Sequence, residues 1–372
     1  MKVAVLLSGG VDSSVALRLL QEQGHRPTAF YLKVWLADDP LRFGDCPWEE
    51  DLRFAEAVCR GLGVPLEVLP MQKEYRERVV DYALEELRAG FTPSPDLFCN
   101  QRIKFGAFLE RIGTGFQRVA TGHYARLEGQ GPDLCLLASP DPVKDQTYFL
   151  AHLDREQLGR ALFPLGDLTK PQVRELARAW DLPTQSRPDS QGICFLGRID
   201  YRGFLRYFLG RQAGPIVELG SGRILGEHPG HWFFTIGQRA GLGLAGGPWY
   251  VAAKEPLGNT VRVTHRLHLA DEVRDRYRVG PGHWIGGPPL PGRPLAVKLR
   301  HGPARIPAAV CPAGEGSWEV SLERGDPGIA PGQFTVFYDG ETCLGCARVL
   351  PESAEAARTS RASPRPASRS LV

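Results

Sequence analysis

Residues 2–14 read "KVAVLLSGGVDSS", an apolar run that leads into a turn with two glycines. The run has the length of a buried strand, and the residues that follow, "SVALRLLQEQG", carry apolar side chains at helical spacing up to Gly24. Glycines between a strand and a helix let backbone N–H groups approach an anion at the positive end of the helix. A Walker loop would carry Lys before its Ser, and none is present here. The stretch therefore predicts a phosphate-binding turn with a different nucleotide chemistry.

Strand and helix patterns continue to alternate through the first part of the chain. This order is typical of an α/β fold with a doubly wound parallel sheet, in which ligands bind at the carboxyl ends of the strands. The elements expected after the first helix are strand 27–35, a helix over 47–63, strand 65–69, a helix over 73–89 and strand 118–122.

After about residue 200 the chain changes to glycines, prolines and short β-type runs, which predict small antiparallel β modules that include a C-terminal β-barrel. These runs lie at 230–238, 247–255, 260–265, 294–300, 317–323 and 333–339. We expect a first domain over 1–203, a small central β-rich domain over 204–272, a barrel over 273–350 and a disordered tail over 351–372.

The composition of the 372-residue chain, with 42% hydrophobic and 23% charged residues, is that of a folded soluble protein of two or three domains. No apolar run approaches the roughly 20 residues of a membrane helix, and no signal peptide precedes the first strand, so we expect a cytoplasmic protein without a membrane partner. The net charge is only +3, of which the tail supplies four Arg and two Glu. A nucleic-acid partner would therefore need a local basic patch.

Eight cysteines in a cytoplasmic chain do not predict a disulfide framework, so each is a core residue, a ligand or a reactive thiol. Cys59 lies in an amphipathic helix and Cys135 in an apolar strand, which indicates packing roles. Cys343 and Cys346 form one CxxC pair, which cannot complete a tetrahedral zinc site by itself.

The "SGGVDSS" loop between a strand and a helix resembles the PP-loop family, whose enzymes split ATP into AMP and pyrophosphate. A strand-to-helix turn with Ser and Asp caps is the alternative that the residues alone allow. The resemblance implies that Asp12 acts in catalysis and binds Mg²⁺. It further implies ATP contacts at Leu6, Leu7, Ser8, Gly9, Gly10, Val11, Asp12, Ser13, Leu32 and Gly122.

Five further stretches make the resemblance more specific. They are "SPDLFCNQRIKFG" at 94–106, "TGHYAR" at 121–126, "KDQTYFL" at 144–150, "DSQGICFLG" at 189–197 and "FYDGETCLG" at 337–345. Together they closely resemble tRNA-specific 2-thiouridylases, and the matches extend from residue 3 to about residue 350.

This resemblance implies thiolation at C2 of the wobble uridine of tRNA, with ATP as cosubstrate and a sulfur-donor protein as partner. ATP would adenylate the C2 oxygen, and a persulfide sulfur would displace AMP. Cys194 would hold the persulfide, and Cys99 would release the sulfur or form a disulfide with Cys194. Two alternatives stay open: buried packing cysteines, or ligation of an iron–sulfur cluster by Cys99, Cys194 and Asp96.

The same resemblance implies contacts to the target base from Ser94, Pro95 and Asp96, with Ser94 where the family usually has Asn. Asp96 would assist proton transfer at the uracil ring or cap the next helix. His123 would meet RNA, or be a structural histidine.

Further tRNA contacts are implied on both sides of the chain's midpoint. Lys144 would contact a phosphate unless it lies in a solvated loop. Thr147, which directly follows residues 144–146, stands where the family usually has Ser. The residues concerned are Lys144, Asp145, Gln146, Arg300, His301 and Gln333.

Two other enzymes and one other class of protein share parts of this pattern. A lysidine synthetase would not explain the motifs of Cys99 and Cys194, and a tRNA 2-thiocytidine synthetase usually carries paired CxxC sequences, which are absent here. A non-catalytic RNA-binding protein with a vestigial nucleotide fold would not need an intact "SGGVDSS" loop. The sequence therefore favours an ATP-dependent tRNA thiolase.

Overall fold

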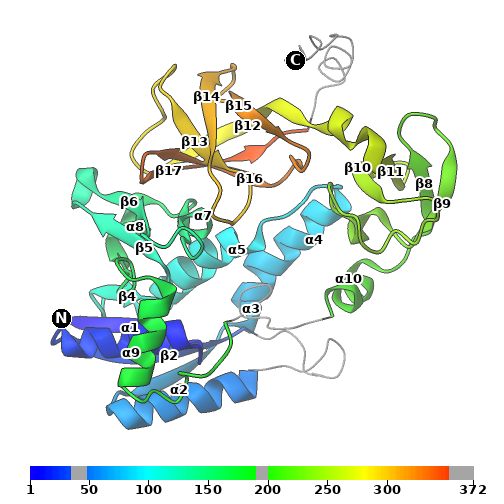
Figure 1. Ribbon diagram of the computed structural model, residues 1–372. Helices are drawn as coiled ribbons and strands as arrows, with labels where there is room; N and C mark the ends of the chain where they lie inside the picture. Colours follow the sequence, from blue (N-terminus) through cyan, green and yellow to red (C-terminus); the bar gives the residue numbers. More distant parts are fainter. Residues whose placement is uncertain (35–47, 190–199, 352–372) are drawn as a thin grey trace, which may run out of the picture.

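The computed structural model describes residues 1–34, 48–189 and 200–351 (Figure 1). Its first unit is a five-stranded sheet in the order β3-β2-β1-β4-β7, in which every neighbouring pair is parallel. The predicted doubly wound parallel sheet is confirmed. Its strands are β1 (Lys2–Leu6), β2 (Arg26–Lys33), β3 (Leu66–Pro70), β4 (Arg118–Ala120) and β7 (Ala161–Leu162).

Helices cover both faces of this sheet because successive strand residues point to opposite sides. Val3 and Val5 of β1 pack with α1 (Val11–Glu22) and α2 (Trp48–Leu62). Ala4 and Leu6 belong to the core on the other face. That face is covered by a helical stretch made of α3 (Gln72–Tyr75), η2 (Arg76–Val80) and α4 (Asp81–Arg88), and by a second made of α5 (Pro95–Phe98), η3 (Cys99–Ala107) and α6 (Phe108–Ile112).

The order in which successive strands are added reverses at β1: β2 and β3 lie on one side of it, and β4 and β7 lie on the other. Such a switch point is where open α/β sheets bind their ligands. The segment after β4 packs tightly on the start of α1: a Cβ added to Gly122 would lie 2.8 Å from the backbone nitrogen of Ser13. The two turns that the sequence assigned to ATP are therefore neighbours.

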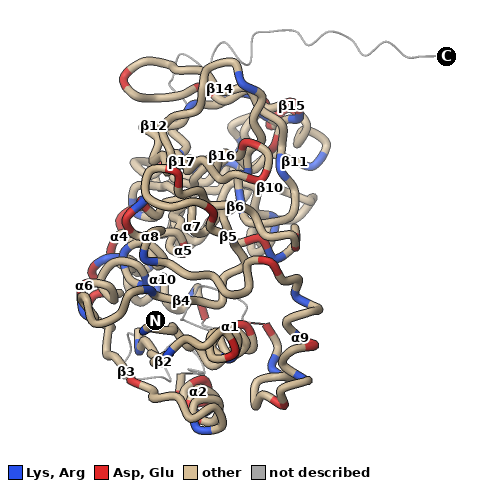
Figure 2. The backbone as a smooth tube through the Cα atoms, turned by 90° about the vertical axis from the view of Figure 1, so that its left-hand side faces the viewer, with Lys and Arg blue, Asp and Glu red and all other residues tan. Residues whose placement is uncertain are grey.

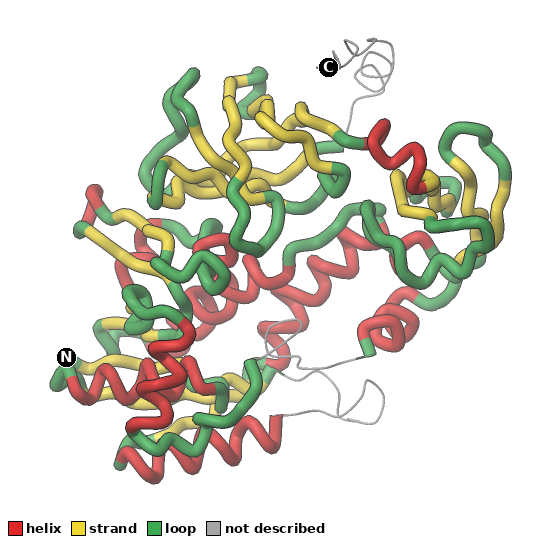
Figure 3. Tube along the Cα trace, in the orientation of Figure 1, coloured by secondary structure: helices red, strands yellow, loops and turns green. Residues whose placement is uncertain are grey.

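A central module follows α10 (Tyr201–Leu209) and forms a four-stranded sheet in the order β10-β11-β8-β9 (Figure 3). The runs at 247–255 and 260–265 were expected as antiparallel strands, and β10 and β11 do pair antiparallel, but β11 also pairs in parallel with β8, which was not predicted. The strands are β8 (Gly214–Glu218), β9 (Ile224–His228), β10 (Trp249–Glu255) and β11 (Thr260–His265).

The expected strand at 230–238 is wrong, because this stretch begins as a 3₁₀ turn, η5 (His231–Phe233). Gly230 precedes the turn with φ of +150°, and the side-chain oxygen of Asn259 accepts a hydrogen bond from the His231 N–H at 3.2 Å. The three residues of η5 are buried. Their apolar bulk thus fills the core of the module without entering its sheet.

The C-terminal module is a closed six-stranded barrel, since β12 pairs with β17 at the end of the order β12-β15-β14-β13-β16-β17. The predicted barrel is confirmed. Its strands are β12 (Arg274–Trp284), β13 (Leu295–Lys298), β14 (Ile306–Pro312), β15 (Trp318–Asp326), β16 (Phe334–Asp339) and β17 (Thr342–Val349).

A hairpin from the first unit extends the barrel sheet. Its strands β5 (Ala125–Glu128) and β6 (Cys135–Ala138) pair with each other, and β6 pairs with β17. The guanidinium of Arg126 and the carboxylate of Glu341 add an ion pair at 2.5 Å. The sequence predicted an apolar strand at Cys135 but neither the hairpin nor its pairing with β17, because alternation reports which face is buried and not which strand lies beside it.

A buried ion pair also fixes the barrel to the first unit. The Lys298 ammonium lies 2.6 Å from the Asp145 carboxylate, and both side chains are 1% exposed. Thr147, at the start of α7 (Thr147–Leu150), donates a hydrogen bond to Asp145 at 2.8 Å, and its hydroxyl is 3.0 Å from that of Tyr338. Breaking such a pair would leave an uncompensated buried charge, so the two units are held in one arrangement.

Most described cysteines lie in the core. Burial raises the pKa of Cys59 to about 11 and that of Cys343 to about 12, so both remain protonated at neutral pH. Cys346 is also buried, whereas Cys135 is partly exposed at the end of β6. These surroundings favour packing roles for Cys59, Cys343 and Cys346.

Charged residues of both signs are interspersed along the tube in the view of Figure 2. Of the helices in the described ranges, none is long and apolar enough to cross a membrane. The predicted disordered tail lies outside the described residues except for Pro351. The remaining short helices are η4 (Gly131–Asp133), α8 (Arg155–Arg160), α9 (Lys170–Ala179) and η6 (Arg266–Glu272).

Candidate active site

The turn after β1 is held in shape by its own serines. The Ser13 hydroxyl accepts a hydrogen bond from the Ser8 N–H at 3.2 Å and donates one to the Gly10 carbonyl at 3.1 Å. Gly9 has φ of +75°, and a Cβ added there would lie 2.2 Å from the backbone oxygen of Asp51. The turn therefore requires glycine at this position for both conformation and space.

The N-terminus of α1 lies open in this turn. Gly10 is its N-cap residue, and within the described ranges no side chain caps the helix. The first N–H groups of a helix need partners from outside it, and the helix dipole adds positive potential there. This end of α1 is therefore suited to bind phosphate, as the sequence predicted for residues 8–13.

Asp12 in the first turn of α1 accepts two hydrogen bonds on the same oxygen. The Tyr124 hydroxyl donates to its Oδ1 at 2.8 Å, and the Lys170 ammonium donates at 2.6 Å. Lys170 is the first residue of α9, and its side chain is 11% exposed. Lys170 was not predicted from the sequence because it stands in no recognisable motif; its only signal is its position before Pro171, at the start of a helix.

Asp189 extends this charge network. Its carboxylate lies 2.8 Å from the Lys170 ammonium, and 2.5 Å from both the Arg174 guanidinium and the Lys144 ammonium. Burial alone would raise the pKa of Asp189, but the hydrogen bonds from Lys144 and Lys170 hold it well below its usual range. Asp189 is thus a permanent anion that gathers three cations beside Asp12.

Arg187 joins the turn to the start of α2. Its guanidinium donates to the Gly9 carbonyl at 2.7 Å and lies 2.8 Å from the Asp51 carboxylate. It also stacks over the ring of Phe54, with 4.3 Å between guanidinium carbon and ring centroid. Arg187 was not predicted from the sequence, and it holds the glycine turn against α2.

A single carboxylate stands where Mg²⁺ was expected. In the described ranges no three His, Cys, Asp or Glu side chains come together as a metal site. Asp12 nevertheless fits a magnesium ion whose other ligands are substrate phosphates and water. Lys170 and Tyr124 both donate to Oδ1 of Asp12, and Oδ2 is the oxygen that would hold the ion. A bound Mg²⁺ would supply neutralisation of phosphate charge.

Cys99 lies at the start of a second candidate region. Ser94 is the N-cap of α5 and Pro95 its first residue, which suits proline because that N–H has no helical partner. Asp96 and Cys99 are three residues apart in one helical stretch, so they share a face. The Cys99 side chain is only 1% exposed.

Asn100 ties this stretch to α7. Its side-chain amide donates to the carbonyls of Asp96 and Phe149, both at 3.1 Å. Cys194 lies outside the described residues, so its predicted approach to Cys99 and the predicted cluster ligation stay predictions. The same holds for the role of Asp96.

His123 is buried in the segment after β4. The side chain is 8% exposed, and its Nδ1 lies 2.7 Å from the Thr121 hydroxyl. Burial, with Lys104 nearby, lowers the pKa of His123 well below its usual value, so the ring is neutral. Its contact with RNA stays a prediction, beside the structural role that the sequence left open.

The three residues at 144–146 for which tRNA contacts were predicted have different partners in the structure. Asp145 is 1% exposed and paired with Lys298, and its contact with tRNA stays a prediction. The Gln146 side chain accepts a hydrogen bond from the Tyr124 N–H at 3.0 Å, which orders the segment after β4. Lys144 is partly exposed and paired with Asp189.

The predicted contacts in the barrel lie nearer the surface. Arg300 is 57% exposed and paired with Asp326. His301 is exposed, and its ring stacks on Phe149 with 4.7 Å between centroids. Gln333 precedes β16 and is partly exposed. Their contact with tRNA stays a prediction.

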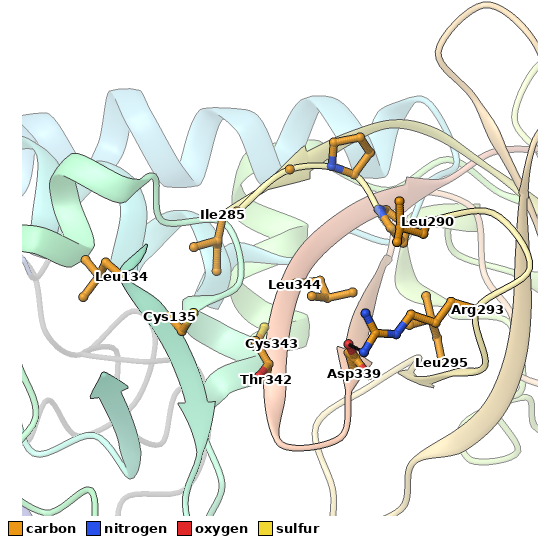
Figure 4. A pocket seen from close by; sticks show the side chains of 14 residues that line it. Leu134, Cys135, Ile285, Leu290, Arg293, Leu295, Asp339, Thr342, Cys343 and Leu344 are labelled. Carbon is orange, nitrogen blue, oxygen red and sulfur yellow. Dashed lines mark ion pairs between the residues drawn. The ribbon is translucent and has the colours of Figure 1, made fainter. Parts of the chain in front are cut away.

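A pocket of about 210 Å³ lies elsewhere, where the barrel meets the β5–β6 hairpin (Figure 4). Apolar side chains such as Leu134, Leu290 and Leu344 line it, and an ion pair of 2.6 Å between Arg293 and Asp339 lies at its edge. None of the predicted site residues is among its lining residues. The open end of α1, with its cations, is the better candidate for a nucleotide site.

Three family models match consecutive parts of the chain. They are a tRNA methyl transferase HUP domain over residues 1–198, a tRNA methyl transferase PRC-barrel domain over 202–265 and an aminomethyltransferase beta-barrel domain over 274–349. A weak structural likeness, with 18% identity and a TM-score of 0.34, relates 57% of this chain to 77% of an NMN synthetase from Francisella tularensis.

Full-length relatives give a sharper result. The chain is 43% identical to tRNA-specific 2-thiouridylase MnmA 1 of Bacteroides thetaiotaomicron, over 94% of this chain and 99% of that protein. It is also 43% identical to tRNA-specific 2-thiouridylase MnmA of Porphyromonas gingivalis, over 91% of this chain and 96% of that protein. By this similarity along nearly its whole length, the chain belongs to the family of tRNA-specific 2-thiouridylases.

Proposed function

We propose that this protein is an ATP-dependent tRNA-uridine 2-sulfurtransferase that thiolates C2 of the wobble uridine. The observation that carries the proposal is the open N-terminus of α1, framed by Gly9 and Gly122, in a chain of this family. A helix end of this kind binds phosphate. Lys170 lies beside it as a cation that would neutralise phosphate charge, and Asp12 lies there as the carboxylate that would hold Mg²⁺. With tRNA and ATP as its substrates, we expect the reaction to take place in the cytoplasm.

The first step would convert the C2 oxygen of uridine into a leaving group. That oxygen attacks the α-phosphate of ATP, a new O–P bond forms, and pyrophosphate leaves. The N–H groups at the start of α1 and the Lys170 ammonium would stabilise the charge on the departing pyrophosphate. Asp96, in the first turn of α5, would accept the proton from N3 of the uracil ring as the adenylate forms.

The second step would transfer the sulfur. The terminal sulfur of a persulfide on Cys194 attacks C2, and AMP leaves with the former C2 oxygen. The Cys99 thiolate then attacks Cys194 Sγ, so that a Cys99–Cys194 disulfide forms and the C2 thiocarbonyl is released. In the alternative sequence, Cys99 first attacks the persulfide and frees sulfide for the attack on C2. Either route consumes a thiol reductant, which must reopen the disulfide before the next cycle.

The matching family models carry the description tRNA methyl transferase, which points to a different reaction. Methyl transfer does not require cleavage of ATP between its α and β phosphates. The phosphate-binding turn at α1 and the 43% identity to 2-thiouridylases along the chain favour thiolation instead.

The proposal is tested by the nucleotide products of a reaction with ATP and unmodified tRNA. We expect AMP and pyrophosphate in equal amounts, since the site binds the β and γ phosphates as the leaving group. Chromatographic separation of the nucleotides measures this directly. Formation of ADP, or turnover that does not depend on tRNA, would contradict the proposal.

A second prediction concerns Lys170. We expect Lys170→Met to lower kcat/KM for ATP by about a hundredfold, because it removes one cation from the pyrophosphate site and leaves Asp12 without its ion pair. Pyrophosphate release at varied ATP measures the effect. Tyr124→Phe is the matched control: it removes the other hydrogen bond to Asp12 but no charge, so it should cost less than tenfold. Equal losses in both variants would refute a charge role for Lys170.

A further inference from the structure

We propose that α10 and the glycine-rich loop at 237–246 form a contact surface for the tRNA backbone, in the central module and apart from the contacts predicted at Lys144 and Arg300. This inference rests on the proposed function, since it takes tRNA as the partner. With a net charge of only +3, the protein must concentrate positive charge locally to bind a polyanion.

The segment 201–211 is such a concentration. It reads "YRGFLRYFLGR" and contains three Arg and neither Asp nor Glu. Arg202, Arg206 and Arg211 are all exposed. Across the described part of the chain, no carboxylate forms an ion pair with any of the three. Arg223 of the same module, by contrast, lies 3.5 Å from the carboxylate of Glu218. Unpaired guanidinium groups on one segment are therefore free to bind phosphate oxygens.

The helix that carries these arginines is firmly held. Phe204 and Leu205 are buried on its inner side. At its end, the carbonyl of Phe208 accepts a hydrogen bond from Arg88 of α4 at 3.5 Å, and the guanidinium of Arg76 lies over the Phe208 ring at 4.4 Å. The arginines of α10 thus project from a fixed element, which lowers the entropy that their ordering on RNA would cost.

The loop at 237–246 extends the surface beyond α10. It reads "GQRAGLGLAG", contains no acidic residue, and exposes Arg239. The Arg202 guanidinium lies against Gly241 of this loop, so closely that a Cβ added to Gly241 would be 2.0 Å from its nitrogen. Gly241 has φ of +78°. The loop that carries Arg239 therefore packs directly against Arg202 of α10.

Exposed aromatic side chains accompany the arginines. The side chain of Tyr207 is 56% exposed and that of Tyr201 is 42% exposed, at opposite ends of the same helix. Exposed tyrosines beside arginines are typical of surfaces that bind RNA, where rings stack on unpaired bases or riboses. In Figure 1, α10 lies below the four-stranded sheet and beside α4.

Binding of an unmodified tRNA transcript tests the inference. Fluorescence anisotropy without ATP or sulfur donor, over a series of salt concentrations, gives the affinity and its salt dependence. We expect Arg202→Gln/Arg206→Gln to bind tRNA about 10- to 100-fold more weakly, with a salt slope reduced by roughly two phosphate contacts. Arg206→Lys, which keeps the charge, should retain most of the affinity.

The matched control is Arg223→Gln in the same module. Arg223 is 68% exposed but lies 3.5 Å from Glu218 near the β8–β9 turn, so its replacement should leave tRNA affinity unchanged. Unchanged affinity and slope in the double variant, with tRNA still bound by the wild type, would overturn this inference alone. A wild type that binds no tRNA would overturn the proposed function. If the double variant unfolds, the comparison of Arg206→Gln with Arg206→Lys decides the question in the same way.

Discussion

A Cys99→Ser protein is expected to cleave ATP in the presence of tRNA and yet to form no 2-thiouridine. The substitution leaves the α1 turn, Asp12 and Lys170 untouched, so adenylation should continue. The serine hydroxyl cannot attack a sulfur to make a disulfide, so the transfer stops before the thiocarbonyl is released. We expect thiolation to fall by at least about a thousandfold, as for loss of an essential nucleophile.

Two measurements separate the steps of this experiment. Pyrophosphate release reports adenylation, and mass spectrometry of the digested tRNA reports 2-thiouridine. Cys135→Ser is the control, because Cys135 is partly exposed and its Sγ donates only to the Asp133 carbonyl at 3.4 Å. It should thiolate normally. The reciprocal variant, Cys194→Ser, should adenylate tRNA but fail to acquire a persulfide. Full thiolation by Cys99→Ser would remove Cys99 from the mechanism.

Gly122→Ala is expected to abolish productive ATP binding. The added methyl group would lie 2.8 Å from the Ser13 backbone nitrogen and 2.9 Å from the Asp12 carbonyl carbon. Both atoms belong to the helix start at which we propose that phosphate binds, so neither can move without displacing that proposed site. We expect ATP affinity to fall by about a hundredfold or more, with a loss of about 1–3 kcal/mol in the free energy of unfolding. Calorimetric titration with ATP and urea unfolding measure the two effects.

Gly61→Ala provides the control for Gly122→Ala. Gly61 lies within α2, and nothing stands within 4 Å of where its Cβ would be. Alanine there should stabilise the protein by about 0.5–1 kcal/mol and leave ATP affinity unchanged. If Gly122→Ala also bound ATP normally, the contact between the segment after β4 and α1 would have no part in the nucleotide site.

The parts of the fold that the sequence predicted are those with strong local periodicity. The strand, turn and helix of residues 2–24 were readable because apolar spacing and glycine placement are local signals. The stretch at 230–238 was misread for the same reason: it is as apolar as a strand, and hydrogen bonds to distant residues, such as that from the His231 N–H to Asn259, help to hold it in turns.

In the candidate site, too, the sequence did not predict contacts between residues far apart in the chain. Asp12 was predicted from its motif, but its partner Lys170 is 158 positions away and stands in no motif. His123 and Asp145 stand within recognisable motifs, yet both are buried and bonded to other side chains. A motif identifies which residues occur together in a family. Whether each one faces the substrate or the core depends on packing that sequence spacing does not record.

The pairing of β6 with β17 has a consequence for how the protein is made. Arg126 and Glu341, which bond across the outer end of this junction, are 215 positions apart. On the ribosome, the first unit emerges with β6 as an open edge strand, whose backbone groups have no strand partner on that side until β17 has been translated. Closing so long a loop is a slow step in folding. Nascent chains stalled before β17 would therefore expose an unpaired strand edge to one another, and the newly made enzyme would depend on rapid translation of β17 to avoid aggregation.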